Sequence, residues 1–186
     1  MVRIVGYDAN VLYPSLLRDL LIRLAQAGLG QAKWTNQILD ETFRNLEANR
    51  PDLDPAVLHR TRKLMIRAVR DCLVAGYEQL IPALQLPDPA DRHVLAAAIK
   101  AHAQTVVTKN LGDFPPGILG CRNIEARHPD EFVLDLRLRS GLTSAPSAQH
   151  DAAAPHSRCG RTPAVLRIRD RLNTVGLARS GVRVAR

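Results

Sequence analysis

The feature that most constrains the fold of this chain is the alternation of short apolar runs with longer segments of helical periodicity. The runs at residues 3–7 (RIVGY) and 105–108 (TVVT) are short, and the second is rich in β-branched residues. Such runs are typical of strands buried on both faces of a parallel sheet. Weaker runs at 32–34, 77–81 and 121–126 predict three further short strands.

Helical segments lie between these runs. Apolar residues recur at helical spacing over 11–28, 36–49, 55–76 and 90–103, and in the third segment they include Val57, Leu64 and Cys72. Thr35 suits the N-cap of the second helix, and Asp88-Pro89 is a strong start for the fourth. Strands that alternate with helices predict an α/β fold: a three-layer α/β/α domain with a short parallel sheet.

Charge and composition change near residue 140. Residues 1–139 hold 18 basic and 16 acidic residues, whereas residues 140–186 hold 8 and 2. We therefore divide the chain into a domain at 1–139, a flexible Pro/Ser/Ala-rich linker at 140–164 and a basic tail at 165–186 that forms at most a short helix. A stretch with so few bulky apolar residues cannot offset the entropy lost on ordering.

Other classes of protein fit the sequence poorly. No apolar run approaches the roughly 18–20 residues that span a bilayer, and the N-terminus lacks the features of a signal peptide, so we expect a cytoplasmic protein without a membrane partner. The three cysteines, Cys72, Cys121 and Cys159, are widely spaced and odd in number. This pattern indicates neither a disulfide framework nor a zinc site.

Four acids occupy positions that a parallel sheet would bring to one edge. Asp8 ends the first apolar run and Asp113 follows the run at 105–108, and ligands bind at the carboxyl ends of parallel strands. Asp91 opens the helix that leads into that second run, and Glu41 lies near the apolar boundary of the helix at 36–49. Carboxylate oxygens suit Mg²⁺ or Mn²⁺, so the four acids predict a divalent-metal site.

Each acid taken alone has a structural explanation. Asp8 could cap the helix that follows it, Asp91 could favour a helix dipole, and Glu41 could lie on a solvated face. Asp113 could be a turn residue, and Asp88 is better explained as a helix cap than as a ligand. Only the ordered set of acids indicates a site.

That ordered set resembles a known family. The segments YDANVL, ILDETFRNL, PDPADRHVLAAAIKA and VVTKNLGDFP surround the four acids in turn. They are similar to the successive motifs of PIN domains, in particular those of VapC-type toxins from bacterial toxin–antitoxin pairs. The resemblance covers about residues 1–135, and its last two motifs are the most specific.

The resemblance implies a metal-dependent endoribonuclease. It implies that Asp8, Asp91 and Asp113 bind Mg²⁺ or Mn²⁺ and that Glu41 is a ligand or orients the attacking water. It further implies that Asn10, Thr108 and Asn110 support the acids, although relatives often carry another acid at the position of Ala90. RNA as substrate, a homodimer and a cognate antitoxin that blocks the site are also implied.

Basic residues offer candidate contacts to RNA phosphates. Arg92 and Lys109 are adjacent to predicted site acids. Arg60, Lys63, Arg67 and Arg70 are spaced to form one stripe on the helix at 55–76. A stripe of this kind is more often a solvated face than a nucleic-acid track.

Two other functions stay open. A phosphatase of the haloacid-dehalogenase kind also has an Asp at the end of its first strand, but it normally has a second Asp where this chain has Asn10. Alternatively, the chain is an inactive PIN-like remnant that only binds RNA or an antitoxin.

Overall fold

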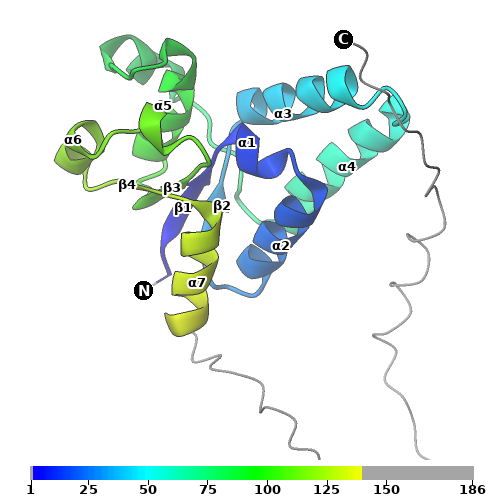
Figure 1. Ribbon diagram of the computed structural model, residues 1–186, viewed down its shortest axis with the longest axis horizontal. Coiled ribbons are helices and arrows are strands. Elements are labelled where there is room, and N and C mark those ends of the chain that lie inside the picture. Colours follow the sequence, from blue (N-terminus) through cyan, green and yellow to red (C-terminus); the bar gives the residue numbers. More distant parts are fainter. Residues whose placement is uncertain (1, 140–186) are drawn as a thin grey trace, which may run out of the picture. The chain divides into compact units, whose positions relative to one another are not determined.

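The computed structural model describes residues 2–139 of the 186-residue chain. The predictions for 140–164 and 165–186 lie outside the described residues. Within them, a parallel sheet has the strand order β2-β1-β3-β4 (Figure 1). The strands are β1 (Ile4–Tyr7), β2 (Gln31–Lys33), β3 (Thr105–Val107) and β4 (Glu125–Arg127). The predicted strands at 3–7, 32–34, 105–108 and 121–126 are therefore confirmed in type; β1, β3 and β4 are shorter than their runs, and β2 is shifted by one residue.

Side chains of the central strand β1 alternate between two helical layers. On one face, Tyr7 contacts Phe132 of α7 (Pro129–Arg139) edge-on, with ring centroids 6.4 Å apart, and its hydroxyl donates to the carbonyl of Leu21 in α2 (Ser15–Gln26). On the other face, a Cβ on Gly6 would lie 3.7 Å from the Cβ of Ala98 in α5 (Arg92–Lys100). Helices thus cover both faces of the sheet (Figure 1), and the predicted three-layer α/β/α architecture is confirmed.

The first two helical segments follow local rules closely. The predicted helix at 11–28 is divided into α1 (Ala9–Leu12) and α2, because Pro14 lacks the N–H that a continuous helix needs. Helix α3 (Asn36–Asn49) has the predicted cap, in which the Thr35 hydroxyl accepts a hydrogen bond of 3.1 Å from the Ile38 N–H. Its predicted apolar face is buried: Ile38, Leu39, Phe43 and Leu46.

The prediction for 55–76 was wrong in length. Helix α4 (Pro55–Ala68) ends eight residues early, and Asp71 adopts the left-handed conformation with φ of 54°. The Trp34 N–H then donates to the Cys72 carbonyl, and the Val74 N–H donates to the Trp34 carbonyl, both at 2.9 Å. The chain after α4 is therefore held as an extended segment beside the end of β2, which a helical count cannot reveal.

The apolar residues that recur at helical spacing in α4, Val57 and Leu64, do not lie on its buried face. Val57 and Leu64 are 54% and 51% exposed, whereas Leu58 and Met65 are buried. Helix α4 packs on α3 and α2 through the neighbouring face. Apolar residues lie along two adjacent lines of this helix, so the sequence alone does not decide which line is buried. The neighbouring helices decide it.

The predicted strand at 77–81 was wrong as well. Residues Glu78–Ala83 form a 3-10 helix, η1. Pro82 within it has no N–H to donate to a sheet ladder. Tyr77 just before it is buried, and its hydroxyl donates to the Gln37 side chain at 3.0 Å.

The remaining described elements are short and shape the loops around the sheet edge. They are the 3-10 helices η2 (Pro89–Asp91), η3 (Leu111–Asp113) and η4 (Gly120–Arg122), and the helix α6 (Pro116–Leu119). Across residues 2–139, no helix has both the length and the apolar character required to cross a membrane.

The corrected face of α4 can be tested with two leucines on the same helix. Leu58→Ala removes a side chain that is 5% exposed, so we expect a loss of about 2–5 kcal/mol in the free energy of unfolding. Leu64→Ala removes one that is 51% exposed, and we expect a change within about 0.5 kcal/mol. Urea unfolding of both variants measures the difference. A larger loss for Leu64→Ala than for Leu58→Ala would contradict the packing described here.

Candidate active site

Asp8 is the most deeply buried of the four predicted site acids. It lies between β1 and α1, is 4% exposed, and its N–H donates to the Val107 carbonyl of the adjacent strand β3. One carboxylate oxygen, Oδ1, accepts a hydrogen bond of 2.6 Å from the Ala9 N–H at the start of α1. The cap that we considered for Asp8 therefore exists. The capping hydrogen bond uses one of the two carboxylate oxygens of Asp8.

The other oxygen of Asp8 belongs to a polar network that joins two strand ends. Oδ2 accepts from the Thr108 hydroxyl and from the Asn10 amide, both at 2.7 Å. The Thr108 oxygen in turn accepts from the Asn10 amide at 2.9 Å and from the Asn110 N–H at 3.0 Å. The Asn10 amide oxygen accepts from the Lys109 N–H at 3.0 Å. Asn10, Thr108 and Asn110 are thus gathered around Asp8.

Burial and hydrogen bonding act on Asp8 in opposite directions. The pKa of its carboxyl is raised on balance, because desolvation raises it more than the hydrogen bonds from Thr108 and the Ala9 N–H lower it. A buried carboxylate is costly unless donors compensate it. The network therefore stabilises the ionised form at the end of β1.

Asp91 and Asp88 have different surroundings although they are three residues apart. The Asp88 carboxylate accepts from the Ala90 N–H at 2.8 Å and caps η2, which confirms the predicted cap. Asp91 lies at the junction of η2 and α5, where its side chain makes no capping hydrogen bond. Burial raises the pKa of Asp91 from 3.8 to about 7, and the charges of Asp8, Asp113, Asp88 and Glu41 add to the effect in that order.

Glu41 and Asp113 reach the same region from two other elements. Burial, followed by the charge of Asp8, raises the pKa of Glu41 on α3, and His93 and Arg44 lower it. Asp113 at the end of η3 raises the pKa of both Asp8 and Asp91. The four predicted acids are therefore electrostatic neighbours, contributed by four separate elements around the carboxyl ends of β1 and β3.

The donor set is of the kind that hard cations prefer. Within residues 2–139, the carboxylates of Asp91 and Asp113 make no hydrogen bond or ion pair, so their oxygens are available as ligands. However, no three His, Cys, Asp or Glu side chains of the described part are arranged as a ready-made metal-binding group. Carboxylate oxygens are the type of ligand that Mg²⁺ and Mn²⁺ prefer. The acid side chains would have to rotate to bind one ion together.

The predicted basic residues are less well placed than the acids. The Lys109 residue is exposed, while Arg92 is half-buried and its Nε has no hydrogen-bond partner in the described part of the chain. Residues Arg60, Lys63 and Arg67 are exposed on α4, and Arg70 is exposed beyond the end of the helix. Exposure alone does not separate an RNA track from a solvated face.

Sequence analysis missed the two basic side chains that act on Glu41. Arg44 follows Glu41 by three residues on α3, a spacing that puts both on one side of a helix. His93 follows Asp91 by two residues and is buried. The first could have been found from helical spacing, whereas the second depends on how α5 packs against α3.

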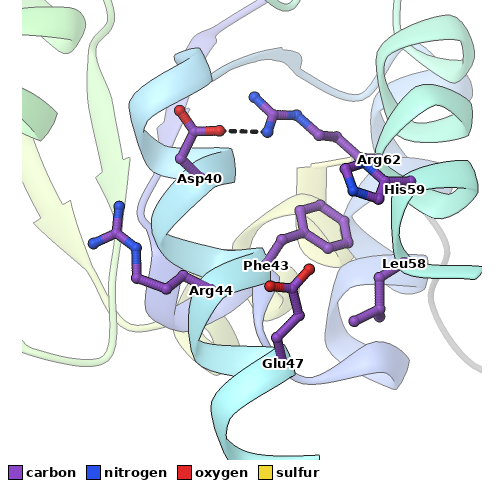
Figure 2. A pocket seen from close by; sticks show the side chains of 7 residues that line it. All are labelled: Asp40, Phe43, Arg44, Glu47, Leu58, His59 and Arg62. Atoms are coloured by element: carbon purple, nitrogen blue, oxygen red, sulfur yellow. Dashed lines mark hydrogen bonds and ion pairs between the residues drawn. The ribbon is translucent and has the colours of Figure 1, made fainter. Parts of the chain in front are cut away.

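A hollow lies between α3 and α4 (Figure 2). Its volume is about 230 Å³. An ion pair between Asp40 and Arg62 crosses one end of it, and Phe43 and Leu58 form apolar parts of its wall (Figure 2). Arg44, Glu47 and His59 complete the lining, but none of the four predicted site acids does. The hollow and the acid cluster are therefore separate features.

Comparison with known proteins places most of this domain in one family. The family model described as PIN domain matches residues 4–112, a range that includes Asp8, Glu41 and Asp91 and ends one residue before Asp113. A 60-residue stretch is 48% identical to a Mycobacterium tuberculosis protein named "Putative ribonuclease VapC50". That stretch covers 32% of this chain and 35% of the relative, so the match spans about a third of the length of each.

The raised pKa of Asp91 predicts a pH-dependent stability of the metal-free protein. Between about pH 4 and pH 7 the folded state retains a proton on Asp91 that the unfolded chain has released, so the contribution of this group to the free energy of unfolding falls as the pH rises. We expect Asp91→Asn to gain stability relative to wild type at about pH 8 and to gain less at about pH 5. Thermal melts in EDTA measure this, with Glu47→Gln as a control on α3. An equal effect of Asp91→Asn at both pH values would contradict the prediction.

Proposed function

The chain belongs to the PIN-domain family, and we propose on that basis that it is a divalent-metal-dependent endoribonuclease that hydrolyses RNA phosphodiester bonds. We further propose that it is the toxin of a toxin–antitoxin pair. One observation carries the proposal: after burial, the charges of Asp8, Asp113 and Glu41 all raise the pKa of Asp91, and Asp8 among them is buried and hydrogen-bonded. Similarity to a relative named as a ribonuclease supports the choice of substrate class. We assign this activity to residues 1–139 as the nuclease domain.

In this proposal the four acids have two roles: three of them bind a cation, and the fourth accepts a proton. In this proposal Asp8, Asp91 and Asp113 hold Mg²⁺ or Mn²⁺. When bound, such an ion supplies a more acidic water and neutralises charge on the phosphate. The two fixed hydrogen bonds to Oδ2 of Asp8 orient this carboxylate before any cation binds. That pre-organisation lowers the cost of assembling the site.

Glu41 is suited to accept the proton of the attacking water. Its side chain is 42% accessible, and its pKa is raised by burial and by Asp8. A base works best when its pKa approaches the working pH. Glu41 would accept a proton from the attacking water as the water oxygen bonds to phosphorus and the bond to the leaving ribose oxygen breaks. Direct ligation of the ion by Glu41 is the other role that we predicted for it.

The partners in this proposal are RNA, a second copy of the chain and a cognate antitoxin. Lys109 and Arg92 are the basic residues next to the site acids in sequence, and we propose them as phosphate contacts. The stripe of Arg60, Lys63, Arg67 and Arg70 is a second candidate for the RNA backbone. Phosphate contacts of this kind weaken as salt is raised.

The phosphatase alternative is disfavoured by the surroundings of Asn10. In that class the second acid after the first strand serves chemistry, and here the position is an amide. The Asn10 amide nitrogen donates to Asp8 and Thr108, and its oxygen accepts from the Lys109 N–H. Both ends of the Asn10 amide are thus hydrogen-bonded, and its nitrogen braces Asp8. An inactive remnant that only binds RNA stays as the alternative that an activity assay decides.

Asp8→Asn tests the proposal with little change of shape. The amide keeps an acceptor for the Ala9 N–H but removes the charge, so we expect weaker Mn²⁺ binding and RNA cleavage reduced by roughly 100-fold or more. Asp88→Ala is the matched control, because its carboxylate caps η2. It should cost about 1 kcal/mol of stability and leave most of the cleavage. Cleavage of a labelled RNA and thermal melts with and without Mn²⁺ provide the readouts.

Two results would count against the proposal. Cleavage at the wild-type rate by Asp8→Asn would exclude the four-acid mechanism. A wild-type protein that binds RNA but does not cleave it in Mg²⁺ or Mn²⁺ would favour the inactive remnant.

A further inference from the structure

The hollow between α3 and α4 combines buried apolar residues with a polar rim (Figure 2). Phe43 and Leu58 are only 6% and 5% exposed, so they form its deeper part. The other lining side chains are more accessible and polar: Asp40, Arg44, Glu47, His59 and Arg62. Sites for drug-sized ligands enclose roughly 300–1,000 Å³. The hollow encloses about 230 Å³, so it suits a smaller group such as one flat ring system.

The charges of the hollow place acceptors inside and cations around them. The carboxylates of Asp40 and Glu47 lie on the side of α3 that faces α4, whereas the Arg44 guanidinium points away from α4 (Figure 2). Arg62 of α4 is engaged in its ion pair with Asp40. On the outer side of α4, Arg60 and Lys63 are exposed. Cations therefore flank the hollow on both helices.

Arg44 also connects the hollow to the acid cluster. It lines the hollow, and its charge lowers the pKa of Glu41, so the two side chains are electrostatic neighbours. Asp40, at one end of the hollow, precedes Glu41 directly on α3. A helix rises about 1.5 Å per residue, so the lining residues of α3 lie within about 10 Å of Glu41 along the helix axis. A ligand in the hollow would be a close neighbour of the proposed site.

This arrangement of charges selects among classes of ligand. A phosphate group inside the hollow would face two carboxylates, which repel it. A cationic side chain of a protein partner would have to pass the cations that flank the hollow. A nucleotide matches both parts, because its base has amino donors and a flat apolar face while its phosphates carry the negative charge.

We propose that the α3–α4 hollow is a subsite that holds one nucleobase of the RNA substrate, next to the phosphodiester bond that is cut. This inference rests on the proposed function, because it takes RNA as the substrate. The face of the base packs against Phe43 and Leu58, and its edge meets the carboxylates of the rim. The neighbouring phosphates lie outside the hollow, near the cations of α3 and α4.

The rim also predicts which bases bind. An ionised carboxylate only accepts hydrogen bonds, so Asp40 and Glu47 favour a base with an exocyclic amino group. Adenine, cytosine and guanine have such a group, whereas uracil has only carbonyl oxygens outside its ring. The subsite should therefore prefer adenine, cytosine or guanine to uracil.

Uncharged nucleosides test the subsite without metal or cleavage. The ¹⁵N-labelled 186-residue chain, in EDTA, is titrated with adenosine, cytidine and uridine, and with ribose as a probe that lacks a base. We expect saturable shifts of the amides of residues 43–47 and 58–62, and none with ribose. Adenosine or cytidine should bind about threefold or more tightly than uridine, the gain from one additional hydrogen bond.

Two variants with the same change of charge locate the binding. Glu47→Ala removes a carboxylate from the rim and should weaken adenosine binding by about threefold or more. Glu131→Ala removes an exposed carboxylate on α7, outside the hollow, and should leave it unchanged. Both positions are exposed, so neither substitution disturbs the core.

The outcomes are separable from those of the proposed function. Absence of saturable shifts at the hollow would overturn the subsite, even in a protein that cleaves RNA, and so would an equal response to ribose and adenosine. Equal weakening by Glu47→Ala and Glu131→Ala would overturn it as well. Saturable adenosine binding at the hollow of a protein that does not cleave RNA would support the base site and contradict the proposed function.

Discussion

The site depends on one hydrogen bond between the ends of two neighbouring strands. The Thr108 hydroxyl, just after β3, donates to the Asp8 carboxylate, just after β1, across 100 positions of sequence. It requires β1 and β3 to be parallel and in register, and the Asp8 N–H bond to the Val107 carbonyl continues that register to the edge of the sheet. A buried charge at this edge is tolerated because these donors surround it. The Asn10 side chain and the N–H of Asn110 then brace the pair.

The other three acids lie around the fixed Asp8 carboxylate, and its charge raises the pKa of Glu41 and of Asp91. The Asp91 carboxylate has neither a capping bond nor another hydrogen bond in the described part of the chain, and it lies among the negative charges of the neighbouring acids. Burial, and after it the negative charges of the neighbouring acids, raise its pKa to about 7. A divalent cation would relieve that repulsion. Asp88, three residues earlier, already has the Ala90 N–H as its partner.

Much of the fold was predictable because the deciding signals are local. Apolar runs placed the strands, and Thr35 and Asp88 marked two helix starts that the structure confirms. The segment after Ala68 was predicted wrongly, because its pairing with Trp34 and the buried face of α4 depend on neighbours distant in sequence. The four acids could be proposed from their order and from the resemblance of their motifs. The closeness of His93 to Glu41 could not, since it depends on how α5 and α3 are placed relative to each other.

The central claim is that Asp8, Asp91 and Asp113 hold a divalent cation, with Glu41 beside them. A titration of ¹⁵N-labelled protein with Mn²⁺, followed by paramagnetic broadening of the amide resonances, tests it most directly. The account predicts that amides near Asp8, Glu41, Asp91 and Asp113 broaden first and together, while those lining the α3–α4 hollow near His59 broaden later. Early broadening confined to one of the four segments, or centred on the hollow, would contradict the account.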